Sequence, residues 1–222
     1  MPGHTGSRWS RRGTRDKHLY SRLVTKRPAV GCLLEIVETL VLTLVIFFVI
    51  QNFVAQPYKV QQQSMERTLE PEQYVLVDKL TPRVDPYSRG DIVVFTPPAS
   101  WVQENGTPFI KRVIGEGGDT VKIKDGKVLI NDTVIEEPYI YADVPGGDPQ
   151  ETFASPDQDS WVIPDGQLFL MGDHRSNSAD SRVFGPVPVE QVIGRAFLRY
   201  WPLDTFGILP TPTYPEIDPV TR

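Results

Sequence analysis

The longest apolar segment of the chain lies near its N-terminus. Residues Thr39–Tyr58 form a stretch of 20 residues without a charged side chain, and its first part, Thr39–Ile50, is almost wholly aliphatic or Phe. As an α-helix, about 20 residues span about 30 Å, the thickness of the hydrocarbon core of a bilayer. We therefore expect a membrane anchor at residues 31–57, with the span itself at about residues 36–56.

A buried core helix and a cleaved signal peptide are the two alternatives to an anchor. The first is disfavoured because a β-rich domain of this size seldom encloses such a helix. The second is disfavoured because the apolar run starts late and no small-x-small cleavage site follows it. The residues at its end read QPYKVQQQS.

From Tyr58 onward the pattern changes to short β-branched runs separated by turns. Seven runs are predicted to be strands: Tyr74–Leu80, Asp91–Phe95, Phe109–Ile114, Val121–Lys124, Lys127–Ile130, Gln167–Met171 and Gln191–Tyr200. Asp125-Gly126, between two of these runs, is typical of a tight β-hairpin. Residues 96–107 and 138–160 are rich in Pro, Gly and acidic residues, and we expect exposed loops there. The tail after Trp201 carries five prolines and is expected to wrap the surface or to be disordered.

These patterns predict a mainly β protein, with a single N-terminal transmembrane helix followed by a largely antiparallel β-sheet or barrel-like domain. No helix of ordinary length is evident outside the anchor. Four parts are expected: a basic cytoplasmic segment at 1–30, the anchor at 31–57, an extracytoplasmic β-rich domain at 58–202, and a Pro-rich tail at 203–222.

The charge distribution predicts how the chain is oriented. The formal net charge is -5, but residues 1–30 hold eight Lys or Arg against one acidic residue, whereas the remainder holds 15 basic and 27 acidic residues. A basic segment directly before an apolar span is explained by the positive-inside rule, which places the N-terminus in the cytoplasm. We therefore expect no nucleic-acid partner, and expect the chain from about Lys59 onward to lie outside.

Cysteine and histidine usage limits the chemistry. Cys32 is the only cysteine, and the chain has three scattered His residues. A disulfide framework and a structural zinc site both need more such ligands. We expect no metal and no cofactor.

Three segments carry candidate chemistry. Ser64 lies in VQQQSMERTL just after the expected span; alone, such a serine is usually a solvated or turn-forming hydroxyl. Lys111 and Arg112 lie within an apolar strand, where neighbours point to opposite faces, so one of them must face the interior or a cleft. The plainer reading of a lysine there is a charge that protects an edge strand. Residues Gly172–Arg182 (GDHRSNSADSR) supply balanced charges that can pair and hold a loop rigid.

Together these segments resemble the type I signal peptidases, the bacterial leader peptidases, over roughly residues 35–200. The resemblance is carried by Ser64-Met65 with Thr68-Leu69, by RGDIVVF at Arg89–Phe95, by KRVIGEGGD at Lys111–Asp119, and by the Gly172–Arg182 block. Order and spacing of these blocks also agree with the family.

The resemblance implies a role for each matching residue. Ser64 matches the nucleophile, Lys111 its general base, and Ser178 the hydroxyl that orients the lysine amine. The charged residues that match supporting positions are Asp173 with Arg112, and Asp180 with Arg182. The oxyanion donors are expected to be the Ser64 N–H and Gln62, which stands where some members carry Ser or Thr. Two further departures are Arg67, where Pro is usual, and His174, where Asn is usual.

The implied activity is removal of N-terminal signal peptides from exported preproteins after small residues, through an acyl-enzyme on Ser64. A serine hydroxyl needs a base, and burial can lower the pKa of a lysine far enough for it to serve as one. The implied partners are signal-peptide-bearing preproteins, the lipid bilayer and the export translocon nearby. The implied location is the plasma membrane of a bacterium.

Other functional classes remain open from the sequence. Self-cleaving repressors use related Ser–Lys chemistry but begin with a soluble DNA-binding domain, where this chain has an apolar span. A membrane-tethered, non-enzymatic β-domain that binds peptide or cell-envelope polymer would give Ser64 and Lys111 no role. A Ser–His–Asp triad through His174 and Asp173 is disfavoured because neighbours in an extended stretch point to opposite faces.

Overall fold

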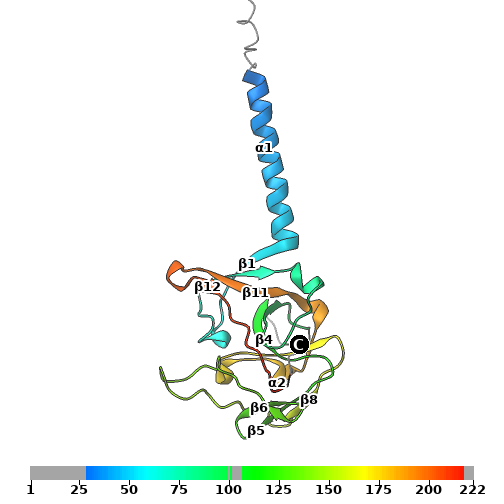
Figure 1. Cartoon of the computed structure of the whole chain (residues 1–222), viewed down its shortest axis with the longest axis vertical. Helices are drawn as coiled ribbons and strands as arrows, with labels where there is room; N and C mark the ends of the chain where they lie inside the picture. Colours follow the sequence, from blue (N-terminus) through cyan, green and yellow to red (C-terminus); the bar gives the residue numbers. More distant parts are fainter. Residues whose placement is uncertain (1–28, 100, 102–106, 218–222) are drawn as a thin grey trace, which may run out of the picture. The chain divides into compact units, whose positions relative to one another are not determined.

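The structure is a computed structural model that describes residues 29–99, 101 and 107–217. These residues divide between Phe47 and Phe48 into two compact units, an N-terminal helical unit and a β-rich unit (Figure 1). The basic segment expected at 1–30 lies outside the described residues, except for its last two.

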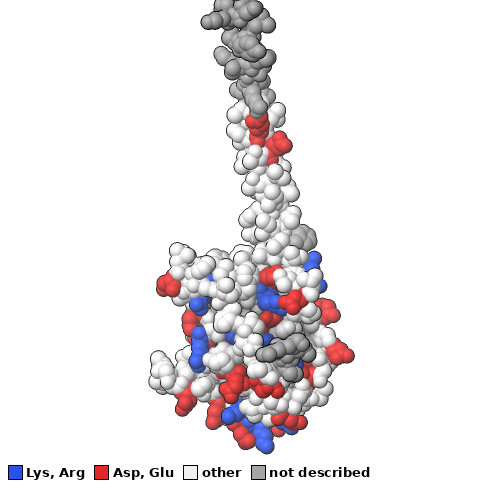
Figure 2. Space-filling view, viewed as in Figure 1, with Lys and Arg blue, Asp and Glu red and all other residues white. Residues whose placement is uncertain are grey.

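The N-terminal helix α1 runs from Ala29 to Val49 and continues into a π-helical turn, η1, at Ile50–Val54. Among the described helices, this one alone is long and apolar enough to cross a membrane, with a mean hydropathy of 2.5 over Gly31–Val49. Most of its surface carries no charge (Figure 2).

The helix differs from the expected span of 36–56 at both ends. It begins before that span and includes Glu35 and Glu38, in keeping with Glu being a good helix former. It ends earlier because the chain becomes a strand at Ala55, just before Pro57, which cannot continue a helix.

The second unit is mainly β, and every pair of its strands is antiparallel, which confirms the predicted fold class. The larger, eight-stranded sheet has the path β1-β2-β11-β3-β4-β9-β10, with β12 also paired to β11. Its strands are β1 (Ala55–Lys59), β2 (Tyr74–Asp78), β3 (Ile92–Phe95), β4 (Phe109–Gly115), β9 (Gln167–Met171), β10 (Val187–Pro188), β11 (Val192–Trp201) and β12 (Gly207–Ile208). The smaller sheet has the order β7-β6-β5-β8. Its strands are β5 (Thr120–Lys124), β6 (Lys127–Ile130), β7 (Thr133–Val134) and β8 (Ser160–Val162).

Only short helical turns occur among the described residues of this unit. They are η2 (Gln63–Met65), η3 (Thr81–Arg83), η4 (Arg175–Asn177), α2 (Ser181–Phe184), η5 (Val189–Gln191) and η6 (Leu203–Thr205). The expectation of no ordinary helix beyond the anchor is therefore confirmed for this part of the chain.

All seven predicted strands are present, with ends shifted by at most two residues. The predicted hairpin joins β5 to β6, and Asp125 and Gly126 have φ values of 52° and 76°. Two positive φ values are what a two-residue type I′ turn requires. The strands that the sequence did not predict are the short β1, β7, β8, β10 and β12.

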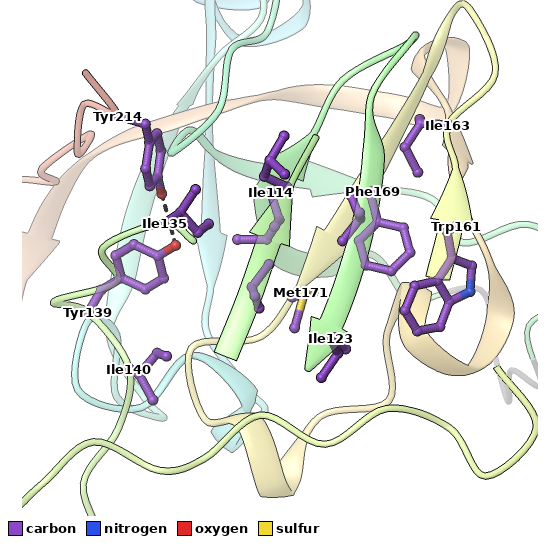
Figure 3. Close-up of a cluster of buried hydrophobic side chains, with 13 residues drawn as sticks. Ile114, Ile123, Ile135, Tyr139, Ile140, Trp161, Ile163, Phe169, Met171 and Tyr214 are labelled. Carbon is purple, nitrogen blue, oxygen red and sulfur yellow. Dashed lines mark hydrogen bonds between the residues drawn. The ribbon is translucent and has the colours of Figure 1, made fainter. Parts of the chain in front are cut away.

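Two segments expected at the surface contribute to the core instead. From the C-terminal tail, Leu209 and Tyr214 are buried, and from the 138–160 segment Tyr139 and Ile140 are buried. The Tyr139 and Tyr214 hydroxyls lie 2.8 Å apart, beside the apolar cluster that includes Ile114 and joins the two sheets (Figure 3). Since each segment contains a few large apolar side chains among its polar ones, burial of those few anchors the whole segment.

Trp101 shows the same effect in the segment expected to be a loop at 96–107. It is buried against Phe95, Phe109 and Phe184. The neighbouring residues 100 and 102–106 lie outside the described residues.

Candidate active site

Ser64 is the middle residue of the one-turn helix η2, which begins directly after the extended residue Gln62. The next apolar residues, Met65 and Leu69, are fully buried and anchor this helix to the core. The Leu69 N–H also donates to the Met65 carbonyl at 2.8 Å. Ser64 itself is 4% exposed. Packing of its neighbours therefore fixes the direction of the Ser64 side chain.

Lys111 lies in the middle of β4, which pairs with β3 on one side and β9 on the other. Its side chain is buried, and Nζ lies 2.6 Å from Ser64 Oγ and 3.2 Å from the Ile110 carbonyl oxygen. An interior strand has no open edge to protect, which excludes the edge-strand reading of this lysine. The structure brings together the two residues that the sequence proposed as nucleophile and base.

Burial lowers the pKa of the Lys111 ammonium from 10.5 to about 8. The charges of Asp180 and Asp173 act in the opposite direction, and that of Arg182 adds to the lowering. Desolvation dominates because it penalises only the charged form of the amine. Near neutral pH an appreciable fraction of Lys111 is therefore neutral and able to accept a proton.

Arg112 points to the opposite face of β4 and is equally buried. Its Nε and Nη2 donate to the two carboxylate oxygens of Asp173 at 2.9 and 2.7 Å, and Nη1 donates to the Gly90 carbonyl at 2.7 Å. The Thr68 hydroxyl also donates to Asp173, at 2.6 Å. A two-pronged Arg–carboxylate pair is geometrically specific, so this contact links β4 to the loop after β9 and to the turn that carries Ser64.

Asp180 and Arg182 form the second expected pair. Arg182 Nε and Nη2 donate to the Asp180 carboxylate at 2.9 and 2.8 Å, and the N–H groups of Arg182 and Gly172 donate to it as well. Burial raises the pKa of Asp180, but these donors outweigh it and hold that pKa below its usual range. Asp180 thereby caps α2 and fixes the loop beside Lys111.

Ser178 does not make the hydrogen bond to Lys111 that the resemblance implies. Its Oγ is buried, and the Ser178 side chain instead helps to lower the pKa of the neighbouring Asp180. It lies over Gly172, where an added Cβ would overlap the Ser178 side chain and the Ser64 carbonyl oxygen. The chain passes closely at this point, and Lys111 bonds to Ser64 and Ile110 instead.

An open cleft of about 510 Å³ lies over the Ser64–Lys111 contact. Its lining residues are Gln61, Gln62, Gln63, Ser64, Pro71, Phe109, Lys111, Asn177 and Ala179. The Gln62 side chain is exposed at this cleft. A second pocket of about 180 Å³ adjoins it, because Gln61, Gln62 and Phe109 line both.

His174 is not part of a catalytic triad in this structure. Its Nδ1 lies 2.7 Å from Glu66 Oε2, and its contact with Ser64 runs from its own backbone N–H to the Ser64 carbonyl. The Asp173 carboxylate is bonded to Arg112 and Thr68 instead. The Ser–His–Asp alternative therefore lacks its geometry.

Sequence reasoning missed several residues that support this site. Thr68 belongs to a motif that carries the family resemblance, but the motif gives it no role. Glu137 pairs with the buried Arg175 at 2.6 Å, and Tyr141 stacks on His174 with ring centroids 4.2 Å apart. Glu137 and Tyr141 lie in or beside the segment expected to be an exposed loop, so no local pattern marks them.

Comparison with known proteins identifies the family. The candidate site is a buried serine–lysine contact under an open cleft in an antiparallel β unit. Residues 33–201 match the family model described as signal peptidase, peptidase S26, and the chain belongs to this family. It is a hydrolase of the serine endopeptidase class.

Named relatives agree with this assignment. The chain is 38% identical to signal peptidase I of Leptolyngbya laminosa over 186 residues, which cover 82% of this chain and 87% of that protein. It is 29% identical to signal peptidase IB of Staphylococcus aureus over 191 residues, 78% of this chain and 92% of that protein. A solved signal peptidase I from Enterococcus faecalis is 31% identical and matches with a TM-score of 0.40, covering 49% of this chain and 95% of that one. The resemblance found in the sequence is confirmed at the level of the family.

Proposed function

We propose that this protein removes signal peptides from exported preproteins, with Ser64 as nucleophile and Lys111 as general base. The observation that carries the proposal is the 2.6 Å contact between Lys111 Nζ and Ser64 Oγ at the floor of an open cleft. The lowered pKa of Lys111 and the names of the relatives support it.

A neutral lysine is costly to form in water. At pH 7 a lysine with a pKa of 10.5 costs about 5 kcal/mol to deprotonate, whereas one with a pKa of about 8 costs only about 1.4 kcal/mol. The desolvating strand thus removes most of the barrier that makes lysine an unsuitable base in water.

The proton moves in a closed cycle. Neutral Lys111 takes the proton of Ser64 as Oγ attacks the scissile carbonyl carbon, and the resulting ammonium gives that proton to the leaving amine. Water then attacks the acyl-Ser64 ester, passes a proton to Lys111, and Ser64 is restored when the proton returns. The Ser64 N–H starts a helical turn and so has no acceptor within it; with the Gln62 side chain it is available to the oxyanion.

The substrate is expected to bind in extended form. Strand β1 is an edge strand of the large sheet, and the chain after it lines both cavities beside Ser64. An edge strand offers backbone hydrogen bonds to an added peptide strand. The pocket of about 180 Å³ is small, which favours small residues before the cleaved bond.

We further propose that α1 anchors the enzyme in the plasma membrane of a bacterium, with the N-terminus cytoplasmic and the β unit outside, near the export translocon. The length and hydropathy of α1 support the anchor, and the basic residues before it support the orientation. Exposed apolar side chains on the β11–β12 hairpin, among them Trp201, Leu203 and Phe206, suit contact with lipid.

The test is cleavage of a preprotein by the full-length protein in detergent, with sequencing of the new N-terminus. We expect one cut after a small residue at the end of the signal peptide, and none with Ser64→Ala. The matched control Ser176→Ala removes an exposed hydroxyl from the nearby loop and should cleave like wild type. No cut by the wild-type protein, or equal cutting by Ser64→Ala, would refute the proposal.

A further inference from the structure

The β-turn that directly follows Ser64 is strained at Arg67. Met65–Thr68 form a β-turn closed by the Thr68 N–H and the Met65 carbonyl at 3.1 Å, and Arg67 has a φ of 81°. Glu66 has φ -52° and ψ 149°, so the turn resembles type II, which favours glycine at the place of Arg67. A side chain in this left-handed region is disfavoured and persists only where its surroundings hold it.

Two side chains of this turn reach across to other segments. Arg67 Nη1 donates to the Ile140 carbonyl at 2.6 Å. Glu66 Oε2 lies 2.7 Å from His174 Nδ1, and both side chains are largely buried, with exposures of 14% and 13%.

His174 is itself held from its other side. Tyr141 stacks on its ring at 4.2 Å with an interplanar angle of 23°. The Tyr141 N–H donates to the Asp173 carbonyl at 3.0 Å, and the His174 N–H donates to the Ser64 carbonyl at 3.1 Å. The position of the imidazole is therefore fixed by contacts that do not involve Glu66.

We propose that Glu66 and His174 form a clamp that positions Ser64 against Lys111. Neither residue lines the cleft, so the pair acts through the turn and not on the substrate. Glu66 is two residues from Ser64, and His174 follows Asp173, which is bonded to Arg112 on the strand that carries Lys111. The clamp thus joins the segment of the nucleophile to the segment that is fixed to the base.

The expected effect is on turnover and not on binding. Small displacements of a reacting group cost rate steeply, so we expect Glu66→Ala and His174→Ala each to lower kcat about tenfold. KM should stay within about twofold, because no substrate contact is lost. Since the two side chains act as one unit, the double variant should be no slower than the slower single variant. Glu66→Gln keeps an acceptor for the imidazole N–H and should recover to within about threefold of wild type.

The inference rests on the proposed function, and the experiment separates the two. Preprotein cleavage gives kcat and KM, and hydrogen exchange of residues 64–69 reports opening of the turn without any need for activity. We expect exchange there about tenfold faster in both alanine variants, with exchange in β4 unchanged. The matched control Lys122→Ala removes the exposed pair with Asp132 on the other sheet and should change neither readout.

Several results would overturn the clamp. Exchange of residues 64–69 at the wild-type rate in both alanine variants would do so, whether or not the protein cleaves a preprotein. Independent losses in the double variant, or a raised KM with unchanged kcat, would do so as well. If an alanine variant unfolds, Glu66→Gln decides, because a loss of kcat beyond about tenfold with β4 protected would show that charge and not positioning is required. An inactive wild type with loosened exchange in the variants would refute the function and leave the clamp supported.

Discussion

Replacing Lys111 by Met is expected to abolish cleavage and to change how stability depends on pH. Lys111 is 1% exposed, and burial depresses its pKa from 10.5 to about 8. The unfolded chain therefore holds a proton on this lysine between pH 8 and 10.5 that the folded protein has lost. By linkage, wild-type stability rises with pH through this window, and below it the buried ammonium destabilises the fold.

The magnitude follows from the size of the shift. A difference of 2.5 between the two pKa values corresponds to about 3 kcal/mol over the whole window, of which about 2 kcal/mol falls between pH 7 and pH 9.5. Methionine has a similar length and no charge, so the variant lacks this dependence. It leaves Ser64 Oγ and the Ile110 carbonyl without the amine, which offsets about 1–2 kcal/mol of the gain at pH 7.

The assay is urea unfolding of the full-length protein in detergent, followed by tryptophan fluorescence at pH 7 and pH 9.5. The stability of Lys111→Met minus that of wild type should be about 2 kcal/mol more favourable at pH 7 than at pH 9.5. Lys124→Met, at an exposed lysine of β5, is the matched control and should show the same difference from wild type at both pH values. A pH-independent difference for Lys111→Met, or measurable cleavage by it, would refute the account of Lys111 as a buried base.

The remaining predictions test the base, the mechanism and the tail. Wild-type turnover should rise about tenfold from pH 7 to pH 9, since the pKa of Lys111 is about 8 and only the neutral amine accepts a proton; a flat rate profile would contradict this. Lys111→Arg should be inactive in single-turnover cleavage because guanidinium stays charged, and wild-type-like turnover would exclude the proposed role. A chelator should leave the rate unchanged, and inhibition that added metal reverses would argue against Ser–Lys chemistry. Tyr214→Ala should cost about 3 kcal/mol of unfolding free energy in urea, because its ring is buried beside Tyr139; a loss below about 0.5 kcal/mol would show that the tail is not part of the core.

Local patterns in the sequence are enough to predict most elements of the fold. The strands with alternating or continuous apolar residues, such as Gln167–Met171, are present at the expected residues. Asp125-Gly126 forms the expected turn because Asp followed by Gly readily adopts the two positive φ values that such a turn requires. Strand alternation alone also places Lys111 and Arg112 on opposite faces of one strand. Strands, tight turns and the alternation of side chains depend on residues that are close in the sequence, so the sequence predicts them.

The candidate site could be located from the sequence through motifs, but its contacts could not. The resemblance named Ser64, Lys111 and the two Asp–Arg pairs, and the structure brings these together. It also implied that the Ser178 hydroxyl orients the Lys111 amine, but in the structure the amine bonds to Ser64 Oγ and the Ile110 carbonyl. The direction of a side chain depends on packing between segments that lie far apart in the sequence, which no spacing rule describes.

Tertiary structure alone decided which irregular segments enter the core and how strongly the site is desolvated. Tyr139, from a Pro-rich and acidic segment, and Tyr214, from a Pro-rich tail, meet across 75 positions of sequence. The depth of Lys111 arises because β4 lies between β3 and β9 with both of its faces covered. A lysine in an apolar strand is compatible with either an edge or an interior position, and the two differ in solvent exposure. The sequence by itself therefore determined which residues are candidates for the chemistry, whereas the pairing of distant strands determined the burial that lowers the pKa of Lys111.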